Sequence, residues 1–134
     1  FYFMADEAVI VESEGGTQDF TVAVGTTIEK MTLCKLADPR TASASDGANV
    51  FAGIAATEKN STDNATELGL FTEGTFVLTA APGAAITAGM AVSLSGANLI
   101  KQATEAEMVT GAAFGKALES IASATTGEVK LGFV

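Results

Sequence analysis

Acidic side chains are the main raw material for chemistry in this chain of 134 residues, which has 16 Asp and Glu, one Cys and no His. Two closely spaced pairs could act as a general acid and a general base, Glu105 with Glu107 and Asp63 with Glu67. Both pairs lie in polar, loop-like sequence without aromatic-rich segments beside them. A solvated surface explains them better than catalysis does, so we expect no catalytic residues and no enzyme.

Side-chain oxygens of Asp46, Asn49, Asp63 and Asn64 could in principle hold Ca²⁺, but they lack the spacing of an EF-hand loop. Turn formation explains these residue types more simply. A zinc site of the usual Cys and His type is excluded, because the chain has one thiol and no imidazole. The glycines at 111 and 115 match neither nucleotide-binding fingerprint. We therefore expect no metal and no cofactor.

Cys34 lies in a strand-like stretch between Leu33 and Lys35, and we expect it to be a small core residue. A single Cys rules out a disulfide within the chain. The lack of His rules out Ser–His and Cys–His nucleophile systems as well.

The composition excludes further classes of function. Net charge is −9, and the seven Lys and Arg are scattered, so we expect no nucleic-acid partner. No apolar run approaches the roughly 20 residues that a membrane helix needs, so we expect no membrane partner. The chain does not open on a basic segment followed by an apolar one, so we expect no secretory signal peptide. Hydrophobic residues make up 48%, too many for a disordered chain.

The elements that must position these residues are short strands. Alternating or β-branched stretches separated by Gly, Pro, Asn and Asp predict strands at residues 9–11, 20–24, 31–36, 51–56, 67–71, 75–79, 91–94, 99–101 and 128–134. Ala, Thr and Gly, with 25, 17 and 14 copies, suit closely approaching strands when they are interleaved. The pattern predicts an all-β fold, a compact sandwich or barrel.

Three local features give sharper expectations. The strands at 67–71 and 75–79, separated by Glu73-Gly74, resemble a hairpin. The small polar stretch 41–49 has the composition of a loop. Thr104 and Glu107 have the spacing of a capping box, which predicts one short helical turn from 104 to 109.

The chain also contains an internal echo. Residues 28–36 resemble residues 86–94, and each stretch leads to an element with an aromatic residue and a Gly, at 51–55 and at 114–118, and then to a further strand. Two interpretations are open, a structural duplication within one compact domain and a chance similarity of two β segments. Two repeats are too few for a solenoid.

The first 25 residues form a unit of their own, with five acidic and no basic residues up to position 19. We divide the chain into this N-terminal arm with a first strand, 1–25, and a β-rich domain, 26–134. Within the arm, an apolar set could add a strand to the sheet edge of a partner, and a disordered tail is the alternative. This set comprises Phe1, Tyr2, Phe3, Val9, Ile10 and Val11.

From Thr26 to Val134 the chain resembles the small capsid decoration, or cement, proteins of tailed bacteriophages. Four stretches in a fixed order carry the resemblance. They are residues 28–36, the Gly-Ile-Ala strand at 53–55, the Ile-Thr-Ala-Gly turn at 86–89, and the ending at 114–119 with 127–131. The chain departs from the pattern at Met31, which stands where the second copy has Gly89, and at Met90, which stands where the family often has Asp.

The resemblance implies a non-enzymatic virion protein that binds the outer surface of the major capsid protein and stabilises the head. It implies a homotrimer, present in the host cytoplasm during assembly, whose N-terminal arm, about Phe1 to Val11, contacts the capsid. A carbohydrate- or receptor-binding β module of a viral fibre or adhesin is the alternative function. Such sites usually present aromatic rings, and this chain has no Trp and one Tyr.

Overall fold

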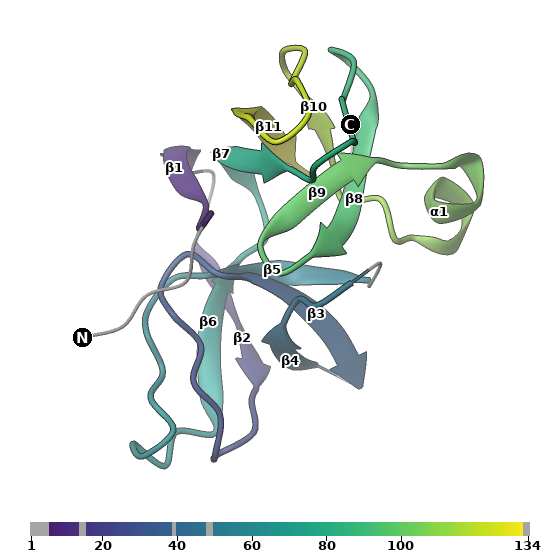
Figure 1. Cartoon of the computed structure of the whole chain (residues 1–134). Coiled ribbons are helices and arrows are strands. Elements are labelled where there is room, and N and C mark those ends of the chain that lie inside the picture. Colours follow the sequence, from purple (N-terminus) through teal and green to yellow (C-terminus); the bar gives the residue numbers. More distant parts are fainter. Residues whose placement is uncertain (1–5, 14–15, 39, 48–49, 133–134) are drawn as a thin grey trace.

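The computed structural model describes residues 6–13, 16–38, 40–47 and 50–132 and forms two β-barrels (Figure 1). The described residues contain eleven strands and one short helix, which confirms the all-β prediction. In Figure 1 the lower barrel comes from the first half of the chain and the upper barrel from the second half.

The first barrel closes five strands in the order β2-β4-β3-β5-β6. They are β2 (Thr17–Thr21), β3 (Leu33–Asp38), β4 (Thr41–Ala44), β5 (Phe51–Ala55) and β6 (Glu67–Phe71). Side chains alternate across each strand, so every second residue points into the barrel. Its core holds Phe20, Val22, Ile28, Cys34, Ala42, Ala52, Ala55, Leu68 and Leu70.

The second barrel uses β7 (Gly74–Ala80), β8 (Ala91–Gly96), β9 (Leu99–Gln102), β10 (Gly115–Ala117) and β11 (Thr126–Leu131). Parallel pairing of β7 with β9 closes the sheet β7-β11-β10-β8-β9. Strand β1 (Val9–Ser13) crosses from the N-terminal arm and pairs with β7, whereas β2 belongs to the first barrel. Helix α1 (Glu105–Thr110) follows β9 and carries the predicted capping box of Thr104 and Glu107.

The two barrels repeat one topology. Each pairing in the first barrel, β2–β4, β2–β6, β3–β4, β3–β5 and β5–β6, has a counterpart of the same direction in the second. The counterparts are β7–β9, β7–β11, β8–β9, β8–β10 and β10–β11. An isolated bridge joins Ile28 to Lys59 in one barrel and Ile86 to Ile121 in the other. The internal echo is therefore a structural duplication.

Backbone conformation follows the same duplication. Met31 and Gly89 occupy equivalent positions, and both have left-handed backbone, with φ of 68° and 86°. The N–H of Met31 donates to Ala55 O at 2.7 Å, and the N–H of Gly89 donates to Ala117 O at 2.8 Å. The two copies therefore share this turn. The left-handed conformation strains the backbone of Met31, whose Cβ comes close to the following carbonyl oxygen, whereas Gly89 has no Cβ.

Two equivalent glycines, Gly53 in β5 and Gly115 in β10, lie where a neighbouring strand leaves no room for a Cβ. A Cβ on Gly53 would lie 2.8 Å from Phe71 O, and a Cβ on Gly115 would collide with Lys130 O. Both barrels therefore require glycine at this place.

The open end of the second barrel packs against the outer wall of the first. Leu33 and Ile54 of the first barrel are fully buried in the core of the second. The ring of Phe51 stacks on that of Phe114, with centroids 3.9 Å apart. The β8–β9 turn adds polar contacts, because the N–H of Leu33 donates to Asn98 Oδ1 at 2.9 Å and Ser45 Oγ donates to Gly96 O at 2.9 Å.

The predicted hairpin of residues 67–71 with 75–79 is wrong. Strand β6 pairs with β2 and β5, whereas β7 pairs with β1, β9 and β11. Closure of the first barrel occupies both edges of β6, so the Glu73-Gly74 turn leads the chain into the next barrel.

The predicted loop at 41–49 is also wrong in its first part, since β4 occupies Thr41–Ala44. This strand has no large apolar residue, and it contributes only Ala42 to the core of the barrel.

Candidate interaction surface

Strand β1 carries the described half of the predicted apolar arm. Val9 lies opposite Val77 and Ile10 opposite Phe76, and a bulge follows Ile10. Val9, Ile10 and Val11 are 58%, 41% and 44% exposed. Phe1, Tyr2 and Phe3 lie outside the described residues. The structure thus brings Val9, Ile10 and Val11 together on one strand at the margin of the second barrel.

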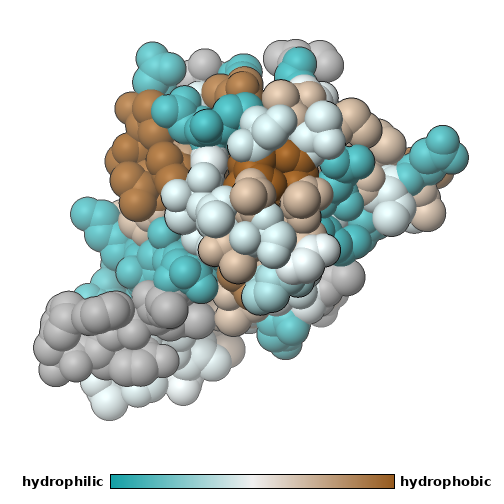
Figure 2. Space-filling view, turned by 45° about the horizontal axis from the view of Figure 1, so that its top comes forward, coloured by the Kyte–Doolittle hydropathy of each residue, from teal (hydrophilic) through white to brown (hydrophobic). Residues whose placement is uncertain are grey.

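We call this strand the β1 margin. It could bind a partner through its apolar side chains and through its outer backbone edge. Figure 2 shows a brown, apolar patch at the left of the molecule, on the side where Figure 1 places β1. Because β1 is the terminal strand of its sheet, its outer backbone edge can accept a further strand. Ala8, just before it, is buried and donates its N–H to Met31 O at 3.0 Å, which anchors the start of the strand to the first barrel.

The carboxylate pair at α1 has a structural role. Glu107 accepts from Lys101 Nζ at 2.7 Å, from Ser93 Oγ at 3.1 Å and from the N–H of Thr104 at 2.9 Å. Burial raises the pKa of Glu107, but these hydrogen bonds and the Lys101 charge outweigh burial, so the pKa is lowered. Glu105 is exposed in the first turn of the helix. Glu107 therefore holds α1 against β8 and β9, and Glu105 takes no part in these contacts.

Asp63 is likewise committed to its own loop. Its carboxylate accepts from the N–H of Ala65 and from the N–H of Asn60, both at 2.9 Å. Those two bonds, with the charge of Lys59, lower the pKa of Asp63. Of the other candidate Ca²⁺ ligands, Asp46 pairs with Lys35 at 2.9 Å, and Asn49 lies outside the described residues. Among the residues that the structure describes, no three His, Cys, Asp or Glu side chains cluster as metal ligands.

Cys34 is fully buried in the core of the first barrel, as predicted. Burial raises the pKa of its thiol to about 12. The thiol is therefore protonated at neutral pH and unreactive.

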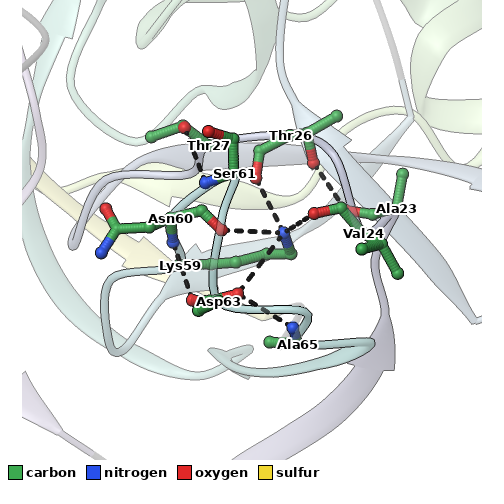
Figure 3. Close-up of polar contacts among 9 residues, drawn as sticks. All are labelled: Ala23, Val24, Thr26, Thr27, Lys59, Asn60, Ser61, Asp63 and Ala65. Carbon is green, nitrogen blue, oxygen red and sulfur yellow. Dashed lines mark hydrogen bonds and ion pairs between the residues drawn. The ribbon is translucent and has the colours of Figure 1, made fainter.

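Sequence reasoning missed Lys59, the largest polar side chain in the interior. It is 1% exposed, and its ammonium donates to the carbonyls of Thr26 at 2.7 Å and Val24 at 2.9 Å (Figure 3). A third carbonyl, of Asn60, lies at 3.3 Å, and Asp63 Oδ1 at 3.9 Å. The second barrel has Ile121 at this position. The ammonium ties together two loops at the end of the first barrel.

The described part of the chain also has a hollow on the second barrel, of about 260 Å³. It is mainly apolar and is lined by Gly89, Met90, Ala91, Met108, Gly115, Lys116 and Gly132. No helix among the described residues is both long enough and apolar enough to span a bilayer.

Comparison with known proteins finds a relation in fold alone. No known family matches the chain, and no curated protein matches its sequence. Among solved structures, the N base of the head fiber gp8.5 of bacteriophage phi29 is similar, with a TM-score of 0.55 at 10% sequence identity. The match covers 87% of this chain and 92% of that one. The double-barrel architecture is therefore one also found in the base of a phage head fibre.

Proposed function

We propose that this chain is a structural protein of a bacteriophage head, bound to the outer surface of the capsid shell. The observation that carries the proposal is the extent of the shared fold, which spans nearly the whole of this chain and of the phi29 fibre base. The ordered β motifs that resemble capsid decoration proteins support the same conclusion from the sequence.

The capsid contact that we propose is the β1 margin. Val9, Ile10 and Val11 expose apolar area that has no partner within the described residues. Burying a fully exposed side chain of this size contributes about 1.5–3 kcal/mol, and these three are about half exposed, so covering each one would contribute about half of that. The major capsid protein is the proposed partner, and a homotrimer is the proposed form on the lattice.

Co-sedimentation with expanded phage heads tests this function. The unaltered chain should sediment with the heads, and Val9→Asp with Val11→Asp should weaken binding at least about tenfold. Val24→Asp is the matched control, because Val24 is 42% exposed but lies in the first barrel, away from β1. Equal binding by all three proteins would contradict the role of β1, and no binding by the unaltered chain would contradict the function.

A sugar- or receptor-binding fibre module is the second candidate, since the neighbour belongs to a head fibre. Among the described residues, however, no aromatic side chain is exposed enough to stack on a sugar ring. Binding to a glycan array without binding to heads would favour this candidate.

A further inference from the structure

The contact between the two barrels within one chain indicates which surfaces could meet between two copies of the chain. It joins unlike surfaces, the open end of the second barrel and the outer wall of the first. Since the barrels are duplicates, each also has the surface that the other uses. The first barrel therefore has an open end of its own, and the second has a wall of its own.

The wall of the first barrel is covered within the chain. Leu33 and Ile54 point out of that barrel and are fully buried beneath the second. The turn between β8 and β9 sits on this wall, where Asn98, 1% exposed, accepts from Leu33 N–H and donates its own N–H to Ser45 Oγ at 3.2 Å.

Within the part of the chain that the structure describes, no barrel covers the corresponding wall of the second barrel. The N–H of Ala55 donates to Thr32 O at 2.9 Å and that of Ala117 to Met90 O at 3.0 Å, so Thr32 and Met90 are equivalent. By the same register, Ala91 and Lys116 are the counterparts of Leu33 and Ile54.

Those counterparts line the 260 Å³ hollow together with Met90 and Met108, which are 39% and 45% exposed. The hollow therefore lies on the wall that corresponds to a docking site occupied in the first barrel.

No described element covers the open end of the first barrel either. Leu36 is the counterpart of Leu94, because Leu36 lies opposite Ala42 in the β3–β4 pair and Leu94 opposite Ile100 in the β8–β9 pair. Leu94 is fully buried in the core cluster that also contains Leu33 and Ile54, whereas Leu36 is 40% exposed. Val50 is 42% exposed, and its backbone carbonyl accepts the N–H of Leu36 at 2.8 Å, so two exposed apolar residues lie on neighbouring strands at this end.

We propose that the open end of the first barrel in one copy, with Leu36, Arg40 and Val50, docks on the wall of the second barrel in the next copy, with Met90 and Met108. Arg40 stands in this turn where Asn98 stands in the other, and both have left-handed backbone, with φ of 48° and 60°. The contact repeats between chains what the chain already makes within itself. Such a head-to-tail contact joins unlike surfaces and closes into a ring when the rotation allows it.

This inference deepens the homotrimer of the proposed function by naming the two surfaces that meet. It is argued from the duplication and needs no capsid, so it can be tested apart from head binding. Light scattering on the full chain, separated by size over a range of concentrations, tests it. We expect a multiple of the 13.5 kDa subunit mass. Met108→Glu and Val50→Glu should each raise the dissociation constant at least about tenfold.

The matched control is Val109→Glu. Val109 neighbours Met108 on α1 and is 86% exposed, but it does not line the hollow. Circular dichroism and thermal melting of each variant report whether it is folded. A monomer at every concentration, or equal association by folded Met108→Glu and Val109→Glu, would overturn the inference. Head binding is measured separately, so either proposal can fail alone.

Cross-linking distinguishes the head-to-tail contact from a two-fold one. Val50→Cys and Met108→Cys would each add one reactive thiol, since Cys34 is buried. A short bismaleimide should cross-link the mixture of the two variants and neither variant alone. Cross-linking of Met108→Cys alone, or none in the mixture, would overturn the proposed geometry.

Discussion

The contact between the barrels depends on Asn98, and Asn98→Ala tests how much it contributes. The substitution removes the acceptor of the Leu33 N–H, which is buried at the contact. An unsatisfied buried N–H costs about 1–3 kcal/mol. Alanine in the left-handed conformation at φ of 60° adds about 1 kcal/mol. The free energy of unfolding should therefore fall by about 2–4 kcal/mol in urea titrations followed by circular dichroism.

Asn64→Ala is the matched control, because Asn64 has the same residue type and nearly the same φ, 58°, but is exposed. Asn64→Ala should lower the free energy of unfolding only by the cost of alanine in the left-handed conformation, about 1 kcal/mol. Asn98→Gly should recover that part and retain the loss of the hydrogen bond. Equal destabilisation by Asn98→Ala and Asn64→Ala would refute the argument that the Asn98 side chain holds the barrels together.

Three further predictions concern the barrel cores and the contact of α1 with its barrel. Gly53→Ala and Gly115→Ala should each lower the free energy of unfolding by about 1–3 kcal/mol, because the added Cβ would clash with the backbone of the neighbouring strand. Gly25 has open space around it, so Gly25→Ala should change the same quantity by less than about 0.5 kcal/mol in the same titration. Cys34, whose pKa is about 12, should react with a thiol reagent at pH 8 only after unfolding in denaturant; rapid labelling of the folded chain would contradict its burial. The lowered pKa of Glu107 stabilises the fold above about pH 4.5, and this contribution is lost as pH falls through the lowered pKa. The free energy of unfolding of Glu107→Gln should therefore decline less on acidification than that of the unaltered chain. Identical pH profiles of the two proteins would count against the Lys101 contact.

Local patterns in the sequence predicted the elements well and their partners less well. Alternation at 67–71 and the capping box at Thr104 depend on neighbouring residues alone, and both match the structure. The pairing of β6 depends on β2, some 50 residues earlier in the chain, and no turn signal encodes that distance. The linker between β6 and β7 is short and contains Gly, so by local pattern alone it cannot be told from a hairpin turn.

The duplication could be seen in the sequence at residues 28–36 and 86–94, but its structural detail could not. Lys59 and Ile121 share one position with opposite chemistry, and Met31 shares another with Gly89. Only the three-dimensional register relates such pairs. The arm residues Val9, Ile10 and Val11 were predicted as an interaction strand. Their pairing with β7 in the second barrel was unforeseen, because it crosses the whole first barrel in sequence.

Electron microscopy of purified phage heads, with and without this chain, tests the proposed function most directly. We expect density of two barrels per copy on the outer surface of heads that carry the chain, with the β1 margin against the shell. Heads that lack the chain should show no such density. Identical surfaces in the two samples, or the chain recovered only from the unbound fraction, would contradict the proposal.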